Sequence, residues 1–251
     1  VAGRGERRSW KITHMCAVEV AGDSEVASEA LKSSLSKHVL SRADAAVIVS
    51  RADAEIRELT IPPAPDNEVP DMVRFIANNE FVSLSEAWAL DYVPLRGDAT
   101  QSRDVLAVGI SPELQQRVMS ITVAAGLKVK HLLLRPLATV DLLGEELSDG
   151  EGRLIIDPNG DQTDMSVVDG SLVLTTRTIR LAASSDVGER TSTLLSEARR
   201  TLASAKSALG NRNISEVVVF GESEHYVNLA KEIETKLELS VRLVMPSQFA
   251  S

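Results

Sequence analysis

The sequence predicts a mixed α/β protein with two lobes. Short apolar runs that are typical of buried strands alternate with helical patterns along nearly the whole chain, from Ser9 to Met245. The 251 residues exceed what one small domain needs, and chains of this length form one large domain or two lobes. Aromatic residues make up only 3% of the chain, so we expect a core built from Leu, Val, Ile and Ala.

The charge and hydropathy of the chain argue against binding to nucleic acid and against insertion into a membrane. The formal net charge is -9, whereas a protein that binds nucleic acid non-specifically needs a surplus of Lys and Arg. The only local basic cluster, from Gly3 to Arg8, is short, and we expect it to be a solvated turn. No apolar run approaches the roughly 18 residues of a membrane-spanning helix. We therefore expect neither a nucleic-acid partner nor direct membrane insertion.

The cysteine content and the start of the sequence give two further expectations. Cys16 is the single cysteine, so no internal disulfide can form, and we expect Cys16 to be a small buried hydrophobe. The sequence starts at Val1, without Met and already among strand-forming residues. We therefore expect it to be a piece of a longer protein.

Residues 54–135 are predicted to form a unit of their own. Ahead of them the patterns predict a strand at Ser9–Val20, a helix from about Ser24 to Leu40 and a short buried strand at Ala45–Ser50. The unit itself is predicted to contain, in order, strand Ala54–Ile61, helix Asp66–Phe81, strands Trp88–Leu95 and Val105–Ile110, helix Ser111–Ala125 and strand Lys128–Leu134. This order is that of a ferredoxin-like unit.

The remainder of the chain is predicted to form a second α/β unit. After a helix at about Leu137–Leu147, three consecutive strands are expected between Arg153 and Leu181. Asp169-Gly170 between apolar flanks predicts a tight hairpin between the second and third of these strands. A long helix at about Glu189–Leu209, a strand at Val217–Phe220, a helix ending near Leu237 and a strand at Val241–Met245 complete the prediction.

This order of elements resembles a lobe of actin-like proteins, and the inserted unit narrows the resemblance. The chain looks like the bacterial branch that contains the cell-division protein FtsA and the pilus-assembly protein PilM, with the secretion protein GspL as a more distant member. The motifs that favour PilM are LTIPPAPDNEVPDMVRFIANNE ending at Glu80, Asp91-Tyr92, Ala125-Gly126-Leu127 with HLLLRPLATVDLL, and Arg177 in the third strand. The resemblance implies actin-like, ribonuclease H-like lobes with an inserted ferredoxin-like α+β subdomain.

The same resemblance implies a division of the chain. Residues 1–53 would form part of the first lobe, and residues 54–135 the inserted subdomain. Residues 136–152 would return to the first lobe as a helix and linker, and residues 153–251 would form the second lobe. The N-terminal strand and phosphate loop of the first lobe are expected to be missing.

Actin-like ATPases hold nucleotide between their lobes, so the resemblance also implies a candidate nucleotide site. Glycine-bearing hairpins donate backbone N–H groups to phosphates, and aspartates at strand ends hold Mg²⁺, usually through water. The matching positions are Asp157, Asn159, Gly160, Asp161, Thr163, Gly221 and Glu222, with Asp157 as the candidate Mg²⁺ ligand. ATP and Mg²⁺ are the implied cofactors.

Two interpretations of this site stay open. Pro158 lacks the N–H that a phosphate clamp would use, and Asp161 adds negative charge where a triphosphate would sit. Glu222 replaces the second glycine of the turn beside the adenosine. These departures favour a plain hairpin tip, with Asn159-Gly160 serving the turn. A working nucleotide clamp is the alternative, and because no catalytic residue can be assigned we do not expect an enzyme.

The sequence gives little support for two other kinds of site, a nucleophile elbow and a histidine metal site. Gly221 to His225, GESEH, resembles a nucleophile elbow with Ser223 as nucleophile, but His225 stands where glycine is needed and no histidine follows to act as base. The four histidines are far apart and lack metal-ligand spacing. We expect them to be surface or packing residues.

The function that the resemblance implies is docking. We expect a cytoplasmic scaffold, peripheral to the inner membrane, of a type IV pilus or type II secretion assembly platform, with a degenerate nucleotide site. A groove between the inserted unit and the first lobe would take the cytoplasmic tail of a single-span, PilN-like membrane protein by strand addition. The alternative is an active actin-like ATPase that binds MgATP between its lobes.

Overall fold

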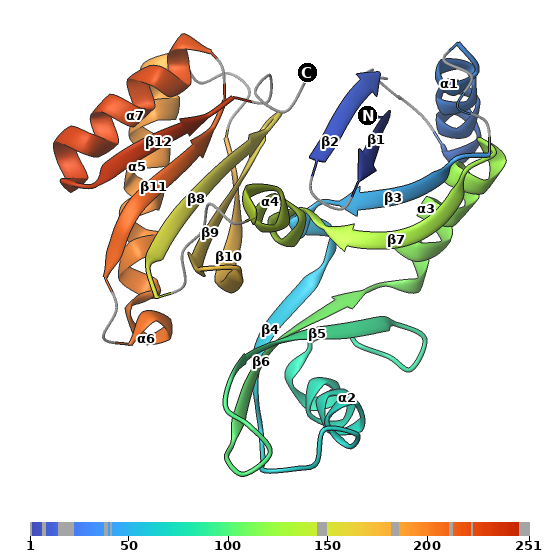
Figure 1. Cartoon of the computed structure of the whole chain (residues 1–251), viewed down its shortest axis with the longest axis horizontal. Helices are drawn as coiled ribbons and strands as arrows, with labels where there is room; N and C mark the ends of the chain where they lie inside the picture. Colours follow the sequence, from blue (N-terminus) through green and yellow to red (C-terminus); the bar gives the residue numbers. More distant parts are fainter. Residues whose placement is uncertain are drawn as a thin grey trace.

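The structure is a computed structural model in which the chain forms two lobes and a smaller unit attached to the first (Figure 1). It describes residues 2–6, 9–14, 23–37, 40, 42–144, 150–181, 186–210, 213–221 and 223–245. Helix α4 (Arg135–Leu143) lies between the sheets of the two lobes, where Figure 1 shows it near the centre of the molecule. No helix in the described part of the chain is long and apolar enough to cross a bilayer.

The second lobe is built on a five-stranded sheet with the order β10-β9-β8-β11-β12. Its strands are β8 (Gly152–Asn159), β9 (Gln162–Asp169), β10 (Leu172–Arg180), β11 (Ile214–Phe220) and β12 (Ser240–Val244). The three strands expected between Arg153 and Leu181 are confirmed as antiparallel neighbours, and β11 runs parallel to β8 and to β12. Helices α5 (Val187–Ser204), α6 (Lys206–Leu209) and α7 (Glu224–Leu237) complete the lobe.

The centre of this sheet is covered on both faces. Successive side chains of a strand point to opposite faces, yet Leu154, Ile155 and Ile156 of β8 are all buried. A strand buried on both faces has a continuous apolar run in place of alternation. The apolar run LII is therefore typical of the central position that β8 has in the sheet.

The first lobe contains two separate pairs of strands. β1 (Ala2–Glu6) pairs antiparallel with β2 (Ser9–His14), and β3 (Asp44–Val49) pairs in parallel with β7 (Lys128–Leu134). Helix α1 (Ser24–Ser36) packs against helix α3 (Pro112–Ala124). Both helices begin where the sequence predicts, because Asp23 accepts hydrogen bonds from the first backbone N–H groups of α1 and Ser111 does so for α3.

One expectation for the N-terminal residues is wrong, and others fall on residues that the structure does not describe. Gly3 to Glu6, expected in a solvated turn, lie in β1, because their backbone pairs with β2. The described part of the strand predicted from Ser9 to Val20 is β2, Ser9–His14. Residues 15–22, which include Cys16, lie outside the described residues.

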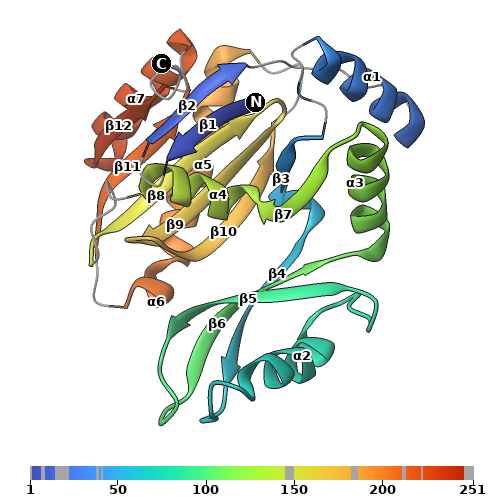
Figure 2. The same ribbon diagram turned by 45° about the vertical axis from the view of Figure 1, so that its right-hand side comes forward.

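The inserted unit is a three-stranded antiparallel sheet with one helix (Figure 2). A one-turn helix at Arg51–Asp53 precedes it, and it contains β4 (Glu55–Ile61), α2 (Val69–Glu80), β5 (Ala89–Arg96) and β6 (Arg103–Ile110) in the sheet order β4-β6-β5. It has a hydrophobic core of its own, centred on Ile61, Val73 and Ala77.

The elements of the ferredoxin-like unit occur in the expected order, but the last strand does not join the inserted sheet. β7, expected within the inserted unit, pairs with β3 of the first lobe, and α3 packs on α1. Leu134 of β7 belongs to the main hydrophobic core, together with Val49 of β3 and Val140 of α4. Because β7 contributes to the larger core, β7 and α3 pack with the first lobe and not with the inserted sheet.

Candidate functional site

The predicted nucleotide-site residues lie at the tip of the β8–β9 hairpin and after β11. Gly160 and Asp161 form the two-residue turn, and Gly160 has φ +63°, a left-handed conformation that favours glycine. Asn159, Gly160 and Asp161 are exposed, whereas Thr163 is buried in β9. The Asp161 carbonyl accepts a hydrogen bond from the Leu181 N–H at 2.8 Å, so the tip is tied to the end of β10.

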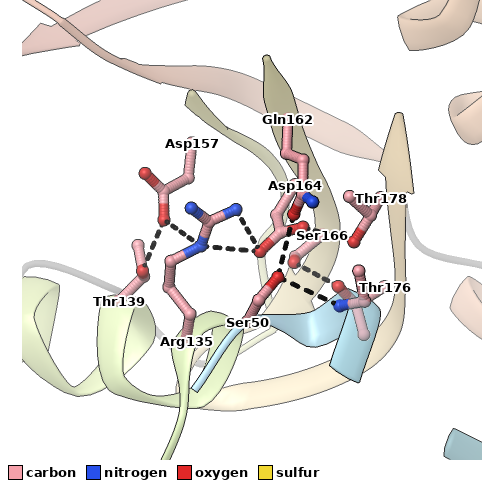
Figure 3. Close-up of polar contacts among 10 residues, drawn as sticks. Ser50, Arg135, Thr139, Asp157, Gln162, Asp164, Ser166, Thr176 and Thr178 are labelled. Atoms are coloured by element: carbon pink, nitrogen blue, oxygen red, sulfur yellow. Dashed lines mark hydrogen bonds and ion pairs between the residues drawn. The ribbon is translucent and has the colours of Figure 1, made fainter. Parts of the chain in front are cut away.

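Behind the tip, two carboxylates share one guanidinium (Figure 3). Asp157 of β8 and Asp164 of β9 are direct partners in the antiparallel register. Arg135, the first residue of α4, places its Nη2 2.6 Å and its Nε 2.8 Å from Asp164 Oδ2. Its Nε is also 3.7 Å from Asp157 Oδ2, which accepts a hydrogen bond from the Thr139 hydroxyl at 2.9 Å.

Further hydrogen bonds extend this network across the lobe junction. Asp164 Oδ1 accepts a hydrogen bond from the Thr178 hydroxyl of β10 at 2.6 Å. Ser50, which follows β3 in the first lobe, donates to Gln162 Oε1 of the second lobe at 2.9 Å. Through Arg135, Thr139 and Ser50, the first lobe and α4 are joined to the β8–β9 hairpin.

Burial dominates the electrostatics of Asp157. Desolvation raises the pKa of its carboxyl above the ordinary value, while Arg135 and the Thr139 hydrogen bond lower this pKa and the Asp164 charge raises it. Asp157 is thus a partly desolvated carboxylate whose Oδ2 already has a hydrogen-bond donor. A water-bound Mg²⁺ needs free carboxylate oxygens with room for its water shell.

The turn after β11 is filled by an aromatic ring. Gly221 has φ +150°, and a Cβ at this position would overlap the Tyr226 ring. Tyr226 and His225 lie at the start of α7 with their ring centroids 4.9 Å apart. Burial lowers the pKa of His225, and so does the Arg190 charge. Glu222 lies outside the described residues.

The residues of the weaker motifs have structural positions. Ser223 stands at the N-cap of α7, and the Nδ1 of His225 lies 3.4 Å from the Thr191 hydroxyl. Arg177 forms an ion pair with Glu197 of α5. Nothing in these contacts builds a nucleophile with its base.

A second candidate site is an apolar cleft between the inserted unit and the first lobe. It has a volume of about 410 Å³. Its walls are β5 and β7, which lie across from each other in Figure 1, with residues of β6, α3 and α4 completing it. The lining residues are Ala89, Leu90, Asp91, Tyr92, Val93, Val108, Ile110, Gln115, Leu132, Leu133, Leu134 and Leu137. Both β5 and β7 stand at the edge of their sheets.

Sequence reasoning missed most of the polar junction, although one signal was available. With the two-residue turn at Gly160-Asp161, antiparallel pairing places Asp164 opposite Asp157. Placing the turn correctly would therefore have found Asp164. Arg135 and Ser50 carry no such signal, because only the packing of the lobes brings them to the hairpin.

Comparisons with known proteins bear on the fold. No protein-family model matches the chain, and no curated protein sequence matches it. The solved structures that match over most of their length include the two described next.

The first solved structure is a PilM-PilN type IV pilus biogenesis complex. It matches with a TM-score of 0.80 and 16% sequence identity over 99% of this chain and 85% of that chain. The second is the cytoplasmic domain of EpsL, an inner-membrane component of the type II secretion system of Vibrio cholerae. It matches with a TM-score of 0.54 and 14% identity over 88% of this chain and 84% of that chain. The chain therefore has the actin-like fold in the form that the PilM structure adopts.

Proposed function

We propose that this chain is a docking scaffold at the cytoplasmic face of an inner membrane, in a type IV pilus or type II secretion assembly platform. The support is the fold, which is shared with a PilM-PilN complex and with the cytoplasmic domain of a type II secretion component. In this proposal residues 1–53 and 136–152 belong to the first lobe and residues 153–251 form the second. The first lobe also takes α3 and β7.

The cleft between β5 and β7 carries this proposal. Edge strands present unpaired N–H and C=O groups that an added strand can bond, and this apolar cleft lies between two of them. An extended peptide about one strand wide fits such a site, with main-chain hydrogen bonds to an edge and side chains in the cleft. We propose as the occupant the cytoplasmic tail of a single-span, PilN-like membrane protein, because the similar solved structure is a complex with PilN.

We further propose that the nucleotide site is degenerate. The residues present do not fit a Mg²⁺-triphosphate. Asp157 is hydrogen-bonded to Thr139 and lies beside Arg135, Pro158 offers no N–H, and Asp161 adds charge at the tip. In this proposal Arg135 supplies the positive charge that a bound metal would otherwise bring to the two carboxylates.

Binding of a tail peptide tests the docking function. The probe is a synthetic peptide of the cytoplasmic tail of a single-span, PilN-like membrane protein, titrated by calorimetry. We expect saturable binding that Leu133→Asp weakens at least tenfold, because a buried leucine contributes about 1.5–3 kcal/mol. Val82→Asp is the matched control, since Val82 is 84% exposed and outside the cleft. No binding, or equal loss in both variants, would contradict the proposal.

A MgATP titration separates the scaffold from an ATPase. We expect no heat and no thermal shift at millimolar MgATP, either in the protein or in its Asp157→Ala variant. Saturable MgATP binding that Asp157→Ala abolishes would establish the alternative, a working nucleotide clamp.

A further inference from the structure

We infer that a docked tail pairs with the open edge of β7 and extends the first-lobe sheet, whereas the main chain of β5 is closed to it. This inference rests on the proposed docking function and names the strand that receives the tail. Both strands border the same cleft, so the choice between them depends on the backbone groups that each edge offers.

The proline in β5 fixes which of its residues face the open edge. β5 pairs antiparallel with β6 on one side and has no strand on the other among the described residues. Pro94 lies opposite Val105 in this pairing and has no N–H. Proline inside a sheet is confined to places where its missing N–H would point away from the ladder. Because backbone direction alternates along a strand, Leu90 and Tyr92 share the outward direction of Pro94.

The second outward N–H of β5 is already bonded. The Tyr92 N–H donates to Oδ1 of the neighbouring Asp91 side chain at 2.8 Å. An N–H that faces β6 would be bonded to β6, so this bond indicates that the Tyr92 N–H points to the open edge. That direction agrees with the alternation set by Pro94. Over Ala89–Pro94 the open edge therefore offers only one free outward donor, the Leu90 N–H. A strand added to β5 would lose one hydrogen bond at Pro94 and would have to displace the Asp91 carboxylate at Tyr92.

The edge of β7 has no such obstruction. Its sequence, KVKHLLL, contains neither proline nor a short polar residue that could cap its own backbone. Among the described strands it pairs only with β3, so alternate N–H and C=O groups face away from that partner. Leu132, Leu133 and Leu134 of the same strand line the cleft, so one strand provides both main-chain partners and apolar contacts.

Capping of β5 has a further consequence for the partner. A strand that formed hydrogen bonds with both edges would join the inserted sheet and the first-lobe sheet into one sheet. A strand that bonds only to β7 contacts the inserted unit through side chains alone. The tail that fits is extended, with apolar side chains toward the leucines of β7, and its backbone hydrogen bonds are made on one side.

Amide hydrogen exchange with and without the synthetic tail peptide tests the inference. We expect exchange in Lys128–Leu134 to slow at least tenfold on binding, while exchange in Ala89–Arg96 stays within about twofold. Slowing confined to Ala89–Arg96 would overturn the inference and leave the docking function standing. Absence of both peptide binding and slowing would refute the docking function itself.

Two variants of Asp91 give an independent readout. Asp91→Ala removes the cap, and Asp91→Asn keeps a side-chain oxygen that can accept from Tyr92. We expect the Tyr92 amide of the free protein to exchange faster in Asp91→Ala than in Asp91→Asn, and this difference in exchange to persist when the tail is bound. If Asp91→Ala alone bound the tail about three- to tenfold more tightly, the gain of one backbone hydrogen bond on β5 would overturn the inference.

Discussion

Arg135 of α4 joins two carboxylates of the β8–β9 hairpin at the junction of the two lobes. Its guanidinium lies between Asp157 and Asp164, and the Asp164 side chain is 1% exposed. Forming a buried ion pair contributes little net stability, because desolvation offsets the attraction. Removing one partner is costly, because it leaves the other charge buried and uncompensated.

Arg135→Ala should therefore lower the free energy of unfolding by about 3–5 kcal/mol, measured by urea denaturation. Arg96→Ala is the control, because Arg96 is 45% exposed and pairs with Glu58 and Asp104 at the surface. Its loss should cost less than about 1 kcal/mol. Similar losses of unfolding free energy in the two variants would show that Arg135 does not form a buried ion pair.

The raised pKa of Asp157 predicts a pH dependence of stability. Burial raises the folded-state pKa above the ordinary value of 3.8, so the folded state keeps a proton that the unfolded state has lost. The contribution of Asp157 to stability then falls as pH rises from about 3.8 through the raised pKa. Asp157→Asn cannot ionise and can still accept from Thr139. Its unfolding free energy relative to the parent should rise across this window in urea titrations, and a constant difference would contradict the prediction.

At the scale of an element, the junction between β11 and α7 depends on a residue without a side chain. Gly221→Ala should destabilise the protein by more than Gly126→Ala. Both glycines have positive φ, but a Cβ at Gly126 meets no atom within 4 Å, whereas one at Gly221 overlaps the Tyr226 ring. We expect roughly 1 kcal/mol for Gly126→Ala and a larger loss in thermal unfolding for Gly221→Ala. Adding Tyr226→Ala should reduce the cost of Gly221→Ala, and an unchanged cost would mean that the ring is not the obstacle.

At the scale of the whole molecule, the two hydrophobic cores differ in size. The main core runs from Val49 and Leu134 of the first lobe through β8 to Val244 of the second. The outer part of the inserted unit has a separate, smaller core under α2. Native-state hydrogen exchange should therefore show α2 amides opening at lower free energy than those of β8 and β9. Equal opening energies would indicate one cooperative unit.

The sequence by itself determined the local elements. Apolar runs predicted β8, β11 and the other buried strands, and helical spacing predicted α1 and α3, whose first turns are capped by Asp23 and Ser111. Periodicity and capping are both set by residues only a few positions apart. The order of these elements also indicated the actin-like fold with an insertion. The sequence predicted that the strand ends at Asp157 and that Asn159-Gly160 forms the turn, whereas β8 runs to Asn159 and the turn is Gly160-Asp161.

Only the tertiary structure decided which elements became partners. The sequence predicted β7 within the inserted unit, but its leucines pack in the main core and the strand pairs with β3. The same packing brings Arg135 to Asp164, 29 residues away, and Ser50 to Gln162, 112 residues away. The choice among possible strand neighbours depends on the total apolar surface that the whole chain buries, and no short stretch of sequence contains that quantity.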